Sequence, residues 1–206
     1  MSTSTPIRTI SAMAAGTIGL ALISTAALAH PGHGEEAVGN MFASGLLHPL
    51  TGFDHLLAML AVGMWAALTH DSIKQAAWTP ISFLCLLLAG ALAGIAGLTL
   101  PAVEPMIMAS LFVLGLLLAS RISLPNWAGA ALVGFFAMFH GLAHGAELPA
   151  GASATAFIAG FMLSTLALHI TGLIGGFALK QHGQWLTRLT GAGIAAYGIV
   201  LFTSAA

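Results

Sequence analysis

The fold is decided by the stretch His48–Met59, HPLTGFDHLLAM, which places two histidines and an aspartate inside an apolar run long enough to cross a bilayer. On a continuous helix His48 and His55 lie on nearly the same face, and Met59 lies one turn beyond His55. Asp54 would project roughly 100° round from His55, toward a neighbouring helix. Because one ionisable group in hydrocarbon costs on the order of 2.5–3.5 kcal/mol, these side chains are expected to point into a pocket and not into lipid.

The composition requires a membrane around this stretch. The chain has 206 residues, of which 58% are hydrophobic and only 5% charged, with a mean hydropathy of +0.98. A single soluble core cannot hide that much apolar surface, so we expect an all-α integral membrane protein. The five Lys and Arg residues form no basic patch, which argues against nucleic acid as a partner. The single cysteine, Cys85, excludes an internal disulfide and is expected to be a small buried hydrophobic residue.

The N-terminus is typical of a secretory signal peptide. Residues 1–29 contain Arg8, a short apolar segment and the small-x-small sequence Ala27-Leu28-Ala29. An uncleaved first transmembrane helix is the alternative, and the dilution of the apolar segment by small polar residues favours cleavage. Residues 30–206 would then form one polytopic membrane domain. Its new N-terminus carries His30 and His33, which either capture a divalent cation weakly or belong to a plain polar tail.

The mature chain is expected to cross the membrane about six times, since apolar segments of spanning length are separated by brief connections with turn-forming residues. The third segment is short and the fifth is long. The predicted spans are Gly45–Leu68, Ala77–Leu98, Pro105–Ser120, Trp127–Glu147, Ala152–Leu179 and Trp185–Thr203.

Charged residues give the orientation. With the mature N-terminus outside, the basic residues after the signal peptide fall in the first, third and fifth connections, whereas the second and fourth connections have glutamates nearby. This positive-inside pattern predicts that the mature N-terminus lies outside and that the first, third and fifth connections are cytoplasmic. The basic residues are Lys74, Arg121, Lys180 and Arg188, and the glutamates are Glu104 and Glu147.

The fourth span carries a second polar motif, FHGLAHGAE. Its His140, His144 and Glu147 are spaced four and three residues apart and therefore share one helix face. Two imidazoles at this spacing can reach one metal ion, with a carboxylate a turn away. No glutamate follows the first histidine, as it does in the zinc-protease motif, so the spacing favours binding and not hydrolysis.

Both motifs fall in the outer half of the bilayer. The first span enters from outside with His48 and His55 near its start, and the fourth span leaves toward the outside with His144 and Glu147 near its end. Two helices of opposite direction thus bring histidines and carboxylates to one depth, which predicts a shared metal site. Imidazole and carboxylate ligands suit divalent Ni, Co, Zn, Cu or Fe, and ligand type alone does not choose among them.

The two motifs, His48-Pro49-Leu50-x-Gly52-x-Asp54-His55-x-x-x-Met59 and Phe139-His140-Gly141-x-Ala143-His144-Gly145-x-Glu147, resemble the signatures of the HupE/UreJ family of bacterial nickel or cobalt permeases. The resemblance covers essentially the whole chain and implies secondary transport across the bacterial inner membrane, with the mature N-terminus in the periplasm, and without an ATPase or a prosthetic group. It also implies a set of metal ligands in the first and fourth spans. These are His48, Asp54, His55, His140, His144 and Glu147.

Residues outside the motifs have weaker claims to function. His169 in the fifth span is either a release-side ligand or an interhelical hydrogen-bonding residue. Glu104 either guides the cation or is a solvated interfacial carboxylate, and Met59 would line the path. His70 and His182 are expected to be solvated. Tryptophans near the cytoplasmic interface are expected to anchor the helices, and glycines are expected to let them pack closely. The tryptophans are Trp65, Trp78, Trp127 and Trp185, and the glycines are Gly90, Gly94, Gly97, Gly172, Gly175 and Gly176.

The function indicated by the residues is a permease for a divalent metal ion, acting alone or as a homo-oligomer in the lipid bilayer. An intramembrane metalloenzyme is one alternative, but it also needs a general base and a substrate cleft. A haem or redox protein with histidine axial ligands is another, and the neighbouring carboxylates argue against it. The expected protein is therefore not an enzyme.

Overall fold

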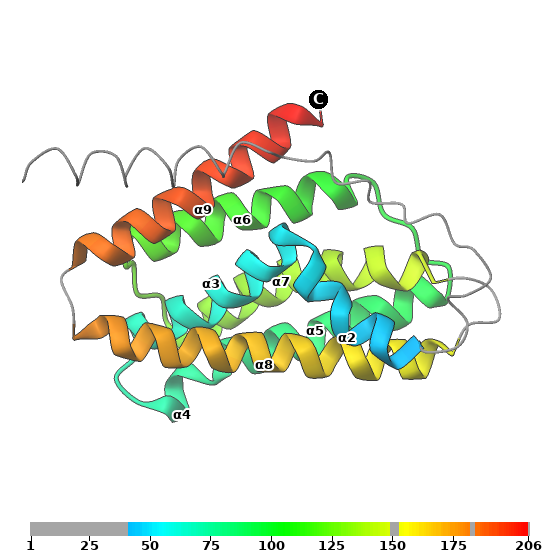
Figure 1. Cartoon of the computed structure of the whole chain (residues 1–206), viewed down its shortest axis with the longest axis horizontal. Helices are drawn as coiled ribbons and strands as arrows, with labels where there is room; N and C mark the ends of the chain where they lie inside the picture. The colour runs from blue at the N-terminus through cyan, green and yellow to red at the C-terminus, as the bar shows by residue number, and fades with distance from the viewer. Residues whose placement is uncertain (1–40, 149–152, 182–183, 206) are drawn as a thin grey trace, which may run out of the picture. The chain divides into compact units, whose positions relative to one another are not determined.

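The computed structural model describes residues 41–148, 153–181 and 184–205, and every regular element within these ranges is a helix (Figure 1). The helices are α2 (Met41–Thr51), α3 (Phe53–Thr69), α4 (Ile73–Ala76), α5 (Trp78–Ile95), α6 (Val103–Ser120), α7 (Asn126–Ala146), α8 (Ala154–Lys180) and α9 (Gln184–Ser204). Five of the membrane-length helices are unbroken, and α2 with α3 makes a sixth span if the bent pair is counted as one. The expected all-α multi-pass fold is confirmed. The predicted signal peptide, His30 and His33 lie outside the described residues.

The bounds of α5, α6, α7, α8 and α9 agree closely with the hydropathy prediction, since no predicted boundary differs from the end of its helix by more than three residues. The third span, α6, is short at 18 residues, and the fifth, α8, is long at 27. The short helix α4 was not predicted, because it falls in a connection. Its N-cap is Ser72, whose hydroxyl accepts a hydrogen bond from the backbone N–H of Gln75.

The first span is broken, so the prediction of one continuous helix is wrong. Gly52 has extended backbone angles (φ −86°, ψ 110°), and the axes of α2 and α3 differ in direction by 77°. Pro49 supplies no backbone N–H within α2, and glycine is a poor helix former, so this segment holds a helix weakly. Asp54 lies in the first turn of α3, where a negative charge favours a helix start.

The long helices associate in three groups, α2 and α3 with α8, α5 with α7, and α6 with α9 (Figure 1). In each group a Cβ atom added to an interfacial glycine would collide with the partner's backbone, so only glycine permits this approach. These glycines are Gly45, Gly63, Gly160, Gly172 and Gly176 in the first group, Gly90, Gly94, Gly141 and Gly145 in the second, and Gly115, Gly191 and Gly198 in the third.

The predicted packing role is confirmed for Gly90, Gly94, Gly172 and Gly176 and is wrong for the other two. Gly175 has no atom within 4 Å of an added Cβ. Gly97 also faces open space, and its positive φ of 88° lets it terminate α5 in the left-handed conformation that helix ends favour.

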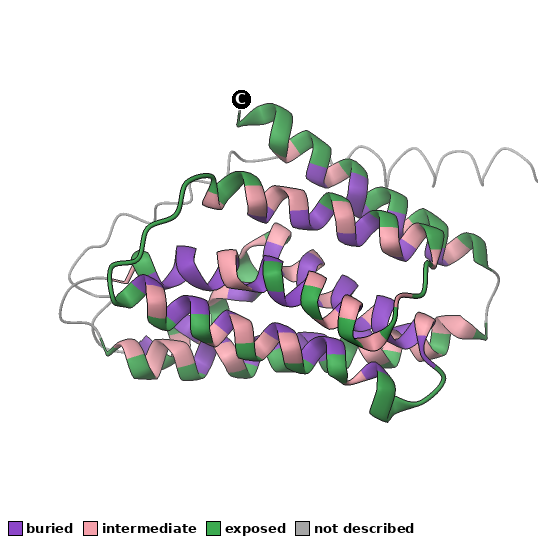
Figure 2. Cartoon of the chain, turned by 180° about the vertical axis from the view of Figure 1, so that it is seen from behind, coloured by how far each residue is buried: buried purple, intermediate pink, exposed green. Residues whose placement is uncertain are grey.

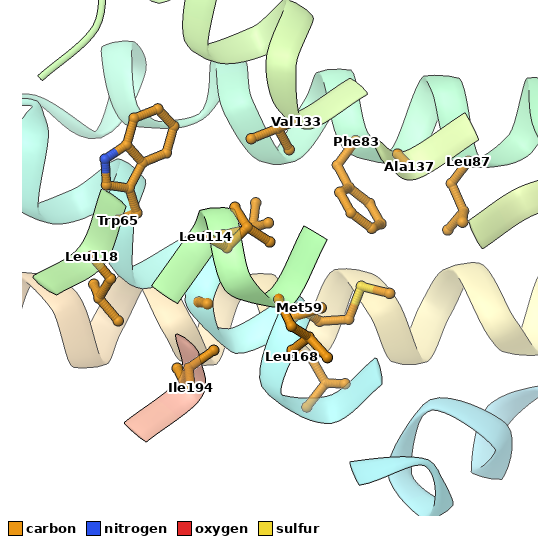
Figure 3. Packing of buried hydrophobic residues seen from close by; sticks show 14 of the residues in the cluster. Met59, Trp65, Phe83, Leu87, Leu114, Leu118, Val133, Ala137, Leu168 and Ile194 are labelled. Atoms are coloured by element: carbon orange, nitrogen blue, oxygen red, sulfur yellow. The ribbon is translucent and has the colours of Figure 1, made fainter. Parts of the chain in front are cut away.

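The apolar interior lies between these groups (Figures 2 and 3). Trp65 is fully buried there and donates from Nε1 to the carbonyl oxygen of Ile122 at 2.9 Å, so its predicted role as an interfacial anchor is wrong. The other three tryptophans are exposed, as an interfacial role requires. Cys85 is exposed on α5, contrary to the expectation that it would be buried.

The connections that carry basic residues meet at the C-terminal end of α3. Lys180 donates from Nζ to the carbonyl oxygen of His70 and to Asp71, and Ile122 lies beside Trp65. His70 is buried and its Nε2 lies 2.7 Å from Oδ1 of Asn126, so the expectation that it would be solvated is wrong. His182 lies outside the described residues. We call this region, around the C-terminal end of α3, the basic end. His55 lies at the opposite end of α3.

Candidate metal site

Three histidines from separate helices converge inside the bundle. His48 of α2, His55 of α3 and His144 of α7 each offer one ring nitrogen, and these nitrogens all lie within 4.8 Å of one another. The Nε2 atoms of His55 and His144 are 2.7 Å apart. The ring centroid of His48 lies 4.5 Å from that of His144 and 5.7 Å from that of His55. We call these three residues the histidine cluster.

The chain path explains why the cluster forms. His55 lies in the first turn of α3 and His144 in the last turn of α7, whereas at the other end Trp65 of α3 lies against Gly129 of α7. The two helices therefore run in opposite directions and face each other across the interior. The bend at Gly52 lies between His48 and His55 in the sequence, yet the rings of these two histidines remain close. The structure thus brings these histidines together as expected, and their role as metal ligands remains a prediction.

Asp54 fixes the orientation of His55. Its Oδ1 lies 3.0 Å from Nδ1 of His55, so Nδ1 carries the proton and donates, and the Nε2 lone pair points toward His144. Asp54 was expected to project toward a neighbouring helix, and the hydrogen bond that the structure gives its carboxylate is to the adjacent residue, His55. A carboxylate behind a histidine in this way orients the ring for metal binding.

Two further carboxylates lie on the more exposed side of the cluster. Glu147 follows the end of α7, and its Oε2 lies 3.8 Å from Nδ1 of His144 while 57% of its side chain is exposed. Glu104 of α6 is also exposed and is close enough to interact electrostatically with Glu147 and Asp54. These negative charges would attract a cation toward the cluster.

His140 lies one turn before His144 and is fully buried, with its ring centroid 5.2 Å from that of His55. Its Nε2 lies 3.1 Å from Oγ of Ser110, and that hydroxyl donates its proton to the carbonyl oxygen of Ile107. Nε2 of His140 must therefore donate to Ser110, which leaves a lone pair on Nδ1. Ser110 was not predicted, because a lone serine in an apolar span carries no spacing signal.

Aromatic side chains of α8 wall the cluster. The ring of Phe161 lies 4.8 Å from that of His144 and 5.9 Å from that of His48, and Phe157 lies 5.9 Å from His48. An apolar wall lowers the local dielectric constant and strengthens the interaction between imidazole nitrogens and a cation. Of the secondary candidates, Met59 and His169 are fully buried but are not members of the cluster.

This arrangement is chemically suited to a divalent transition-metal ion. Neutral imidazole nitrogens near carboxylates are the ligands that such ions prefer. Two nitrogens bound at right angles to one ion, each at about 2.0–2.1 Å, lie about 2.9 Å apart. The separation of 2.7 Å between the Nε2 atoms of His55 and His144 is close to that spacing.

Replacing Asp54 by asparagine is expected to weaken nickel binding by about 10–100-fold, because the negative charge behind His55 is lost while the shape is kept. Isothermal titration calorimetry of the purified full-length protein in detergent measures the affinity. The matched control is Asp71→Asn, which removes an aspartate paired with Lys180 at the basic end. Equal affinities for the two variants would show that Asp54 does not support the site.

Comparison with known proteins places the chain among its relatives. The family model described as "HupE / UreJ protein" matches residues 18–201. A curated relative, "Protein HupE" of Rhizobium leguminosarum bv. viciae, is 38% identical over 184 residues, which cover 88% of this chain and 94% of the relative. No solved structure matches. Since the family model spans most of the sequence and the relative is similar along nearly its whole length, this chain belongs to the HupE/UreJ family.

Proposed function

We propose that this protein is a secondary permease that imports divalent nickel or cobalt across the bacterial inner membrane. The observation that carries the proposal is the convergence of three imidazoles from α2, α3 and α7 within one membrane-spanning bundle. The family is associated with uptake of these two metals, which supports the choice of substrate. With the N-terminus in the periplasm, the histidine cluster lies on the periplasmic side and the basic end faces the cytoplasm.

In this mechanism the exposed carboxylates of Glu104 and Glu147 concentrate the hydrated cation at the periplasmic mouth. The imidazoles of the histidine cluster then replace part of its water shell. Asp54 keeps the Nε2 lone pair of His55 directed at the ion. Ligands of this kind bind a borderline divalent ion firmly enough to strip its water and, in a series of sites, loosely enough to pass it on.

The geometry favours this function over a haem protein. Two histidines that bind opposite faces of a haem iron hold their nitrogens about 4 Å apart, twice a metal–nitrogen bond length. The Nε2 atoms of His55 and His144 are closer than that, at 2.7 Å, and their rings touch. An intramembrane enzyme would need a general base beside the metal, and the half-buried carboxylate of Asp54 is hydrogen-bonded to His55.

The test is uptake of radioactive nickel or cobalt by liposomes that contain the purified full-length protein. We expect uptake well above that of protein-free liposomes, and little competition from an excess of Mg²⁺, because Mg²⁺ prefers oxygen ligands. Uptake at the rate of protein-free liposomes would overturn the proposal, and a Soret band in the purified protein would favour haem instead.

A further inference from the structure

His169, near the middle of α8, is a buried polar residue that the histidine cluster does not use. Its side chain is 0% exposed, and neither ring nitrogen has a hydrogen-bond partner among the described residues. A neutral imidazole carries one donor and one acceptor, so burying both without partners is unfavourable. A ligand that binds this ring would offset that cost.

Thr165, one turn before His169, shares this property. It is also 0% exposed, and its hydroxyl has no partner in the part of the chain that the structure describes. Elsewhere in the spans a threonine hydroxyl donates to the carbonyl oxygen one turn earlier, as Thr171 does to Ala167 at 2.8 Å on the same helix. The two residues are four apart and lie on one helix face, so one nitrogen-bearing and one oxygen-bearing side chain are available together. We call Thr165 and His169 the inner pair.

The inner pair lies between the histidine cluster and the basic end. Phe161 of α8 packs against His144, and His169 follows eight residues later, about 12 Å further along the helix axis. Lys180, which binds Asp71 at the basic end, lies another eleven residues on, or about 16 Å. The inner pair is therefore deeper in the bundle than the cluster, in the direction that an imported ion would travel.

A row of buried rings connects the histidine cluster to the inner pair. The ring centroids of His55 and His140 are 5.2 Å apart, those of His140 and Phe83 are 6.0 Å apart, and those of Phe83 and His169 are 4.9 Å apart. Phe83 is 1% exposed and belongs to the buried interior shown in Figure 3. Nδ1 of His140, also without a partner among the described residues, adds a nitrogen lone pair along this row.

We infer that the inner pair, Thr165 and His169, is a second binding position for the divalent transition-metal ion, occupied after the ion leaves the histidine cluster by way of His140. This inference rests on the proposed permease function. The ring nitrogen of His169 and the hydroxyl oxygen of Thr165 are ligands that a borderline divalent ion accepts. Passage through a low-dielectric interior requires more than one site, since an ion that leaves the first site needs ligands to receive it.

The experiment compares His169→Leu and Thr165→Val with Thr171→Val, a matched control on the same helix whose hydroxyl is exposed and already hydrogen-bonded. Each full-length variant is purified, its tightest nickel-binding event is measured by calorimetry, and its nickel uptake is measured in liposomes. We expect that event, assigned to the histidine cluster, to be unchanged, and uptake by both inner-pair variants to fall by about tenfold or more. Thr171→Val should match the unmodified protein in both measurements.

Measurements of thermal stability distinguish a role of the inner pair in transport from a purely structural role. Replacing a buried polar group that lacks a partner by an apolar one is neutral or stabilising, so we expect both inner-pair variants to unfold at or above the temperature of the unmodified protein. A lower unfolding temperature in both variants would indicate a structural role and overturn the inference. Normal uptake by His169→Leu would also overturn it while leaving the permease proposal intact, whereas failure of the unmodified protein to import metal would defeat both.

Discussion

Replacing His144 by alanine is expected to weaken nickel or cobalt binding by more than about 100-fold and to abolish uptake, because the loss of a direct ligand exceeds the loss of a carboxylate behind one. The substitution removes the nitrogen that faces Nε2 of His55 at 2.7 Å and leaves only two of the three imidazoles of the cluster. His55→Ala is expected to act in the same way. Calorimetry on the purified protein and uptake by liposomes measure the two effects.

The control for this prediction is His70→Ala, which also removes a buried histidine. His70 follows the C-terminal end of α3, whereas the histidine cluster lies at the N-terminal end of that helix. That variant loses a hydrogen bond to Asn126 and is expected to be less stable, with its metal affinity retained. If His144→Ala binds metal as tightly as His70→Ala, the histidine cluster is not the binding site.

Replacing Gly90 by alanine is expected to destabilise the protein by about 3 kcal/mol, the upper end of the usual range for overpacking. The added Cβ would collide with the carbonyl oxygen of Met138 and lie 3.1 Å from the backbone nitrogen of Leu142. Neither is the flexible end of a side chain, so α5 and α7 must move apart. Apparent melting temperatures of purified protein in detergent, at one fixed scan rate, measure the effect.

Gly175→Ala is the matched control, because it places the same methyl group on a spanning helix with no atom within 4 Å. Its melting temperature should equal or slightly exceed that of the unmodified protein, since alanine is the better helix former. Equal loss of stability in the two variants would mean that backbone contact between α5 and α7 is not the cause.

The sequence predicts most of the fold because the thickness of the bilayer sets the length of each apolar segment. It thereby also sets where the polar, turn-forming connections fall. The sequence also predicts that His55 and His144 lie close together. The first and fourth spans run in opposite directions, so the start of one and the end of the other lie on the same side of the membrane. The break at Gly52 escapes prediction because hydropathy records how apolar a segment is and not the direction of its axis.

Other corrections arise from partners that are distant along the chain. In the sequence Trp65 looks like an interfacial anchor and His70 like a solvated loop residue. Each is buried with a hydrogen-bond partner from elsewhere in the chain, Trp65 with the carbonyl oxygen of Ile122 and His70 with Asn126. Cys85 is apolar enough for the interior, but its position on α5 turns it outward. In each case the decisive contact or direction depends on how the helices pack.

In the proposed permease, the grouping of the helices has a consequence for how metal release would be coupled to motion of the helices. Within a group, close backbone contact at the glycines is expected to resist sliding, so we expect each group to move as one body. His48 and His55 belong to the body of α2, α3 and α8, whereas His144 belongs to the body of α5 and α7. An ion held by all three residues therefore fastens the two bodies to each other. If the protein imports metal as proposed, the two bodies would separate only after those coordinate bonds break, so metal release and rearrangement of the helices would occur together.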